Sequence, residues 1–103
     1  MAIYMTARWS TQPGTETEVI LALKEFIQAV QKNEPGTKIY TALQEKGNPN
    51  AFMTYFIFEN ESAREFHRNS EWVKKFTSII YPAKEGEVEF TEYQLIASTD
   101  EPE

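Results

Sequence analysis

The segment from Ala51 to Glu59 reads AFMTYFIFE and is apolar on both of the faces that a β-strand would present. Because side chains alternate across a strand, three phenylalanines would point to one side and three other apolar residues to the opposite side. The two sets are Phe52, Phe56 and Phe58, and Met53, Tyr55 and Ile57. Such a strand has to be covered on both sides. The chain offers two good helical segments, enough for one side, and we expect a second copy of the chain to cover the other.

The N-terminal third predicts a strand followed by a helix. The strand would run over Ile3–Gln12, where Pro13-Gly14 interrupts it. Thr15 and Glu18 have the spacing of a capping box, in which each side chain bonds to the other residue's backbone amide. Apolar residues then recur at helical spacing, at Val19, Leu23, Phe26, Ile27 and Val30. Glu34-Pro35-Gly36 would end the helix, because proline disfavours helical geometry in the residue before it.

The middle of the chain predicts a hairpin and a second helix. A strand alternates over Thr37–Glu45, and the turn at residues 46–50 joins it to the doubly apolar segment. Asn60 is a favourable N-cap for the helix that follows. The inward stripe of this helix is expected at spacings of i, i+3, i+4 and i+7. Its members would be Ala63, Phe66, His67 and Ser70.

The last third predicts a further helical piece and a final strand. Ser70 would begin the helical piece, and Pro82 and Gly86 would end it. The final strand would run over Val88–Ala97. Its apolar positions change parity on the way, which predicts a β-bulge near Thr91-Glu92.

This order of elements, β-α-β-β-α-β, predicts an α+β fold of the ferredoxin-like type, with a four-stranded antiparallel sheet and both helices on one face. Residues 1–97 would form the single domain, and residues 98–103 an acidic C-terminal tail. The bare face of such a sheet would measure about 500 Å². Two such faces packed together would bury about 1,000 Å², near the lower bound for a specific interface. We therefore expect a homodimer that forms through the sheet faces.

Charge and composition exclude several classes of partner. Sixteen acidic and ten basic residues give a formal net charge of −6, which argues against nucleic acid and anionic membrane surfaces. The chain has no cysteine and a single histidine, so a metal site is not expected. No apolar run approaches the roughly 20 residues that span a bilayer, and the N-terminus does not resemble a signal peptide. A cytoplasmic location is the expectation.

RNA-recognition domains share this order of elements and display aromatic residues on their central strands, as Phe56 and Phe58 would be displayed here. The acidic net charge argues against RNA binding. The basic and glycine residues that the third-strand motif of those domains requires are also missing. We therefore set this interpretation below the others.

His67 is the ionisable residue with the clearest chemical potential. It lies on the predicted inward stripe of the second helix, and a neutral imidazole can act as a general base near pH 7. The structural alternative is a histidine that is held by a backbone or hydroxyl partner at the edge of the core. Arg64 and Arg68 flank His67 and are expected to face solvent.

Three motifs occur in a fixed order: Pro13-Gly14, Glu34-Pro35-Gly36, and Ala63-x-x-x-His67-x-x-Ser70. As a set, they resemble the antibiotic biosynthesis monooxygenase family of dimeric α/β barrels, over nearly the whole chain. The resemblance implies a ferredoxin-like protomer, a homodimer joined through its sheets, and a pocket between sheet and helices. Many members of that family are cofactor-free oxygenases of quinols, anthrones and related polycyclic phenols.

The chain departs from that family at two places. Many members carry a glutamate in the third strand where this chain has Phe56, and its loss removes a possible partner for the base. The haem-degrading branch carries an asparagine near the place of Ala7, and a second histidine that is absent here. The resemblance therefore implies that haem is not the substrate.

The resemblance implies that the protein is a cofactor-independent monooxygenase, which oxidises a small aromatic quinol or polycyclic phenol with O₂. It would need no cofactor and no metal, and His67 would be the catalytic base or a hydrogen-bonding anchor. The candidates for the substrate pocket are Trp9, Tyr55, Phe66 and Trp72. From the residue types alone, a plain core role is favoured for each of them over contact with a ligand. The alternative is a non-catalytic dimeric protein that binds a small ligand or serves as an accessory module, which the missing acid at Phe56 favours.

Overall fold

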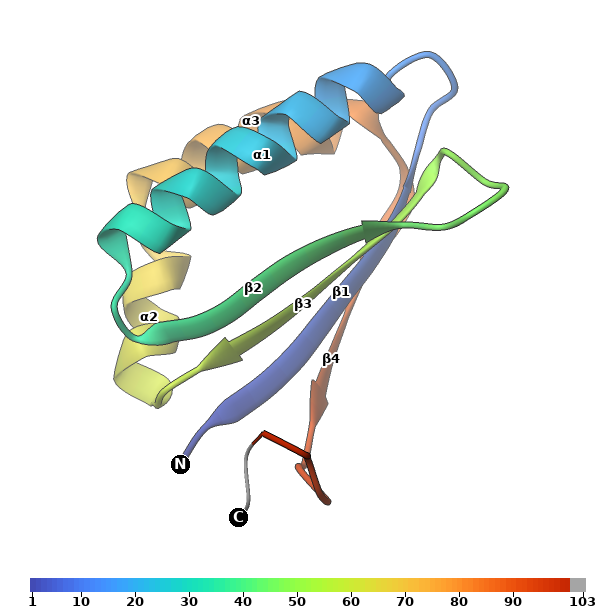
Figure 1. The fold of residues 1–103 in the computed structure, drawn as a ribbon. Helices are drawn as coiled ribbons and strands as arrows, with labels where there is room; N and C mark the ends of the chain where they lie inside the picture. Colours follow the sequence, from blue (N-terminus) through green and yellow to red (C-terminus); the bar gives the residue numbers. More distant parts are fainter. Residues whose placement is uncertain (101–103) are drawn as a thin grey trace.

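A four-stranded antiparallel sheet and the helices that lie against one of its faces make up the fold (Figure 1). The computed structural model describes residues 1–100. The elements are, in chain order, β1 (Ile3–Thr11), α1 (Glu16–Asn33), β2 (Thr37–Gln44), β3 (Ala51–Phe58), α2 (Glu61–Arg68), α3 (Glu71–Ala83) and β4 (Lys84–Tyr93). The strands lie in the order β2-β3-β1-β4. The predicted ferredoxin-like class is confirmed, with two consecutive helices, α2 and α3, before the last strand.

Strand β3 lies inside the sheet and is apolar on both faces, as predicted. It pairs with β1 on one side and with β2 on the other, so that Phe56 lies between Met5 and Tyr40. Phe52, Phe56 and Phe58 belong to the buried core beneath the helices. Ile57 is also buried, although it lies on the opposite face. The predicted alternation along this strand is therefore confirmed.

The sheet face that points away from the helices carries large apolar side chains. Figure 1 shows no helix on this side. Ile39, Leu43 and Tyr93 are 41%, 52% and 49% exposed there. The second chain copy that would cover this face stays a prediction.

All three helices begin where the sequence predicts, but only α2 and α3 begin with a side-chain cap. Asn60 accepts a hydrogen bond from the amide of Ala63 at 2.9 Å, and the hydroxyl of Ser70 accepts one from Val73 at 3.2 Å. The predicted capping box at Thr15 is wrong. Its hydroxyl instead donates to the carbonyl of Gln12 at 2.6 Å, because the turn that follows β1 brings this carbonyl within reach.

The C-terminal boundaries also differ from the prediction. Helix α3 continues through Pro82 to Ala83, and β4 then spans Lys84–Tyr93 rather than Val88–Ala97. A proline in the last turn removes one helical hydrogen bond, and this loss is tolerable close to a helix end. The tail is described only as far as Asp100, so residues 101–103 of the predicted acidic tail lie outside the described residues.

The β-bulge lies at a different place from the one predicted. Arg8 pairs with Glu89 and Ser10 pairs with Glu85, so β4 has two more residues than β1 in this interval. Gly86 has a φ of +82°, which suits an irregular strand position. The pairing between β1 and β4 is regular around Thr91. The change of parity instead arises because the two apolar residues lie on opposite faces of a regular strand. Phe90 lies on the helix side, and Tyr93 lies on the opposite face.

Candidate active site

A cavity of about 460 Å³ lies between the helix side of the sheet and the helices. Its walls are mainly apolar and come from four strands and three helices of the described chain. The apolar residues include Trp9, Phe26, Phe56, Phe58, Phe76 and Ile80. The polar residues are Tyr40, Thr54, Arg64, His67, Arg68, Thr77 and Tyr81. A mostly apolar cavity of this size with few polar groups is typical of small-molecule sites.

His67 contacts the carboxylate of Glu34 at the wall of this cavity. Its Nδ1 lies 3.0 Å from Oε1 and 2.9 Å from Oε2 of Glu34. The His67 side chain is 12% exposed and that of Glu34 is 1% exposed. Because an ionised carboxylate only accepts hydrogen bonds, Nδ1 carries the hydrogen. Within residues 1–100, Nε2 has no hydrogen-bond partner, and a neutral imidazole would keep its lone pair there.

Two further donors hold the Glu34 carboxylate. The hydroxyl of Thr37 donates to Oε1 at 2.5 Å, and the indole N–H of Trp72 donates to Oε2. Burial by itself raises the pKa of Glu34, but the hydrogen bonds from His67, Thr37 and Trp72 outweigh it. The pKa of Glu34 is therefore below its ordinary value of 4.5, and the residue is a carboxylate at neutral pH.

The segment Glu34-Pro35-Gly36 explains how the carboxylate reaches His67. The amide of Glu34 closes helix α1 by bonding to the carbonyl of Val30 at 2.9 Å. A Cβ atom on Gly36 would lie 2.6 Å from the Cβ of Ala63, so only glycine lets α2 approach this loop. Ala63 and His67 are one helical turn apart on the same face of α2. The close approach at Gly36 therefore positions His67 against Glu34.

Aromatic rings surround the imidazole. The ring centroids of Phe58, Tyr40 and Phe26 lie 5.1, 5.6 and 5.8 Å from that of His67. Tyr40 also stacks on Phe56 with a centroid distance of 4.6 Å. Burial raises the pKa of the Tyr40 phenol, so its hydroxyl stays protonated at neutral pH. The surroundings of His67 are therefore apolar, apart from Glu34 and its partners.

The structure brings some of the predicted site residues together and separates others. His67 and Trp9 line the cavity. Trp72 does not line it, but supports His67 indirectly through Glu34. Tyr55 pairs with Thr6 and Thr41 on the sheet face away from the cavity, because its neighbours Thr54 and Phe56 point to the helix side. Tyr55 therefore does not line the cavity, although it was one of the candidates named from the sequence.

Phe66 and Arg64 exchange the environments that the sequence predicts for them. Phe66 is 54% exposed and packs edge-on against Trp72 with a centroid distance of 6.0 Å, so the predicted inward stripe does not include it. Arg64 lines the cavity, and its side chain is only 19% exposed. Helix α2 is rotated so that Arg64 and His67, rather than Phe66, face the sheet.

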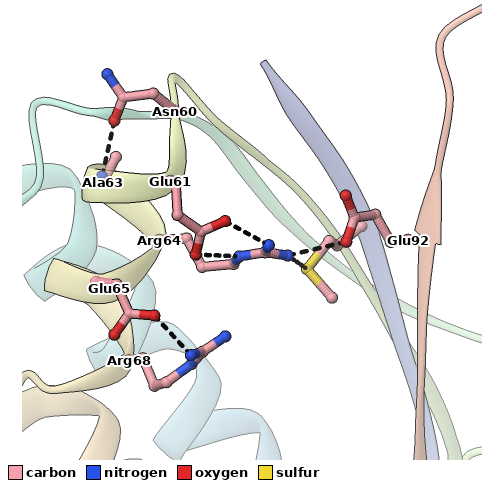
Figure 2. A network of polar contacts seen from close by, with 8 residues as sticks. Asn60, Glu61, Ala63, Arg64, Glu65, Arg68 and Glu92 are labelled. Carbon is pink, nitrogen blue, oxygen red and sulfur yellow. Dashed lines mark hydrogen bonds and ion pairs between the residues drawn. The ribbon is translucent and has the colours of Figure 1, made fainter. Parts of the chain in front are cut away.

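Arg64 reaches from α2 across β1 to β4, and Figure 2 shows its ion pairs with Glu61 and Glu92. Its Nη2 lies 2.6 Å from Glu61, and its Nη1 lies 3.0 Å from Glu92 and 3.5 Å from the sulfur of Met5. Arg68, one turn along the helix, pairs with Glu65 at 2.7 Å. Arg64 thus connects two elements across one end of the cavity.

The fold and the cavity together define a small ferredoxin-like domain with an apolar site beside a histidine–carboxylate pair. A model of the antibiotic biosynthesis monooxygenase family matches residues 2–78, so the chain belongs to this family. No helix among residues 1–100 is long and apolar enough to cross a membrane.

Solved structures share this fold at low sequence identity. A protein from Bacteroides thetaiotaomicron superimposes with a TM-score of 0.88 at 22% identity, covering 95% of this chain and 92% of that one. A protein from Caulobacter crescentus gives 0.87 at 18% identity, with coverages of 93% and 91%. Both are provisionally described as antibiotic biosynthesis monooxygenases. A conserved protein from Methanosarcina mazei gives 0.83 at 22% identity, with coverages of 91% and 92%. The curated proteins contain no significant match.

Proposed function

We propose that the protein is a cofactor-independent monooxygenase that oxidises a small aromatic quinol or polycyclic phenol with O₂. The observation that carries this proposal is the contact between Nδ1 of His67 and the buried carboxylate of Glu34, at the wall of an apolar cavity. The family match supports an oxygenase activity in general terms. The mainly apolar, aromatic lining of the cavity supports an aromatic substrate, and the choice of a quinol or phenol follows the family resemblance.

His67 is the general base of the proposed reaction. The Glu34 carboxylate holds the hydrogen on Nδ1, which keeps Nε2 free to take a proton from the substrate. The carboxylate also stabilises the imidazolium that forms. A substrate that fills this mainly apolar cavity would displace water from it, so the resulting phenolate would be less solvated and more easily oxidised.

The substrate supplies every electron that the reaction needs. Its anion transfers one electron to O₂, and the resulting radical and superoxide combine to a peroxide at a ring carbon. The imidazolium protonates this peroxide. Loss of the proton on that carbon then breaks the O–O bond and forms a carbonyl, and the departing hydroxide leaves as water. One oxygen atom enters the product and the other enters water, so O₂ takes up four electrons from the substrate and no external reductant is consumed.

Oxygen consumption tests this proposal directly. The purified protein, incubated with a chelator, is given a panel of hydroquinones and anthrones while O₂ uptake and product are followed. We expect turnover by the unmodified protein and a loss of about 100-fold or more in His67→Ala, the usual contribution of a general base. Glu71→Gln, which removes an exposed carboxylate of α3 that pairs with Lys74, is the matched control. Unchanged turnover in His67→Ala would remove this residue from the mechanism.

We also propose that the protein forms a homodimer through the sheet face that carries Ile39, Leu43 and Tyr93. The three exposed apolar side chains support this proposal, since a soluble protein rarely leaves such a face uncovered. Sedimentation at micromolar concentration tests it, and a stable species of 12 kDa would refute it.

A further inference from the structure

We infer that the cavity binds a planar aromatic carboxylate, whose acid group is held at α2 by Arg64 and Arg68. This inference rests on the proposed function and deepens it, because it names the class of substrate. It assigns separate tasks to neighbouring residues of one helix. His67 acts on the hydroxyl-bearing ring, and the two arginines hold the carboxylate.

The charges at the cavity wall are the first line of support. The whole chain has sixteen acidic and ten basic residues. The cavity, however, is lined by Arg64, Arg68 and His67 and by no carboxylate among residues 1–100. Arg64 and Arg68 are four positions apart and so lie on the same face of α2. The ionisable side chains that line the cavity are therefore basic, whereas the chain as a whole is acidic. Basic lining residues favour a negatively charged ligand.

The environment of Arg64 is the second line of support. Its own side chain is 19% exposed, whereas those of its partners Glu61 and Glu92 are 58% and 55% exposed. Ion pairs with such exposed carboxylates are weak. Because Arg64 also lines the cavity, a ligand carboxylate inside it could form a charge-assisted pair with the guanidinium, and such pairs are strongest when both N–H···O bonds form.

Arg64 also has donor capacity to spare. One of its N–H groups points at the sulfur of Met5, 3.5 Å away, and a thioether is a poor acceptor. This contact joins α2 to β1, and it lies on the same nitrogen of Arg64 as the ion pair with Glu92 that Figure 2 shows. A carboxylate oxygen in the cavity would replace the sulfur with a much better acceptor. Arg68, 58% exposed and paired with the equally accessible Glu65, can turn toward the same anion.

The aromatic walls determine the rest of the ligand. Phe26 and Phe76 stack at a centroid distance of 4.4 Å, and Tyr40 and Phe56 stack at 4.6 Å. All four line the cavity, and flat aromatic surfaces of this kind favour a flat apolar ligand body. The combination of flat apolar walls and an arginine end fits an aromatic ring system that carries one carboxylate.

Calorimetric titration with naphthoate and its neutral methyl ester tests the inference without any oxygen chemistry, because neither compound is a quinol. We expect the unmodified protein to bind naphthoate about tenfold more tightly than the ester, as one charge-assisted pair would give. Arg64→Gln should remove most of this preference, and Arg64→Gln combined with Arg68→Gln should abolish it. Lys75→Gln removes a cation on α3 that pairs with Glu25 outside the cavity, and it should retain the preference.

A second variant keeps the test valid if Arg64→Gln does not fold. Glu92→Gln removes a carboxylate that competes for Arg64, and we expect it to tighten naphthoate binding about threefold, within the range of one exposed ion pair. Equal binding of acid and ester, or an acid preference that survives when both Arg64 and Arg68 are replaced by glutamine, would overturn the inference. Turnover of neutral quinols without any carboxylate preference would overturn it and leave the oxygenase intact. Naphthoate binding that depends on Arg64 would uphold it even where no quinol consumes O₂.

Discussion

The buried carboxylate of Glu34 makes a prediction that can be tested by stability alone. Glutamine at this position has nearly the same shape, and its amide oxygen can still accept the hydrogen bond from Trp72. Its NH₂ group would face the hydroxyl of Thr37, which can rotate to accept. The variant therefore loses the charge rather than the contacts. Each of the hydrogen bonds with His67, Thr37 and Trp72 becomes weaker by about 1 kcal/mol, because its partner at position 34 is no longer a charged group.

The expected cost of Glu34→Gln is about 2 kcal/mol at pH 7, because relief from burying a charge offsets part of the loss. For a domain of this size, such a change lowers the melting temperature by roughly 10 °C. Thermal unfolding followed by circular dichroism measures this shift. The matched control is Glu25→Gln, which removes an exposed carboxylate of the same helix that pairs with Lys75. It should change the melting temperature by no more than about 2 °C.

The pH dependence provides the sharper test. The pKa of Glu34 is lower in the folded protein than its ordinary value of 4.5, so the folded state binds fewer protons than the unfolded state between these two values. The stabilisation by this carboxylate is complete above pH 4.5 and is lost as the pH falls through the folded-state pKa. The unmodified protein and Glu34→Gln should therefore converge in stability in acid. A difference that stays constant from pH 7 to pH 3 would refute the reasoning.

The remaining predictions concern other parts of the molecule. Gly36→Ala should destabilise the protein by about 1–3 kcal/mol in chemical denaturation, because the new Cβ would meet that of Ala63. The same change at Gly47, where nothing lies within 4 Å of the new Cβ, tests the strain of a positive φ without the clash and should cost less. Leu43→Glu should shift the sedimentation equilibrium from dimer toward monomer, because it buries a charge in the proposed interface. A Leu43→Glu protein that stayed dimeric would place the interface elsewhere.

Sequence patterns predict the sheet and the core of this protein because both depend on local periodicity. The alternation in β3 and the spacing of Val19, Leu23 and Phe26 in α1 repeat over short distances, and each places its apolar residues in the core. The caps at Asn60 and Ser70 are local for the same reason. The end of α3 near Pro82 and the bulge of β4 near Gly86 were less predictable, because both depend on the residues that pack around them.

The site was predicted only in part, because its main contact joins residues far apart in the chain. Glu34 is 33 positions before His67, and no periodicity links them. The Glu34-Pro35-Gly36 motif indicates a helix end, and its glycine hints at a close backbone approach, but neither feature names the partner. The rotation of α2 decides between Phe66 and Arg64. A helix of eight residues is too short for its apolar pattern to fix that rotation.

Phe56 shows how the position of an acid changes what a cavity can bind. The resemblance implies that a phenylalanine at this place removes one possible partner of the base, and the structure supplies another, because Glu34 contacts His67. A carboxylate at position 56 would stand in the cavity wall, whereas Glu34 lies behind the imidazole and does not line the cavity. The base thus keeps an acidic partner while no carboxylate among residues 1–100 faces the ligand. An anion that approaches Arg64 from the cavity would therefore meet cations and aromatic rings, while Glu61 and Glu92 contact the same guanidinium from positions that do not line the cavity. The negative charge of Glu34 would be shielded by His67 itself.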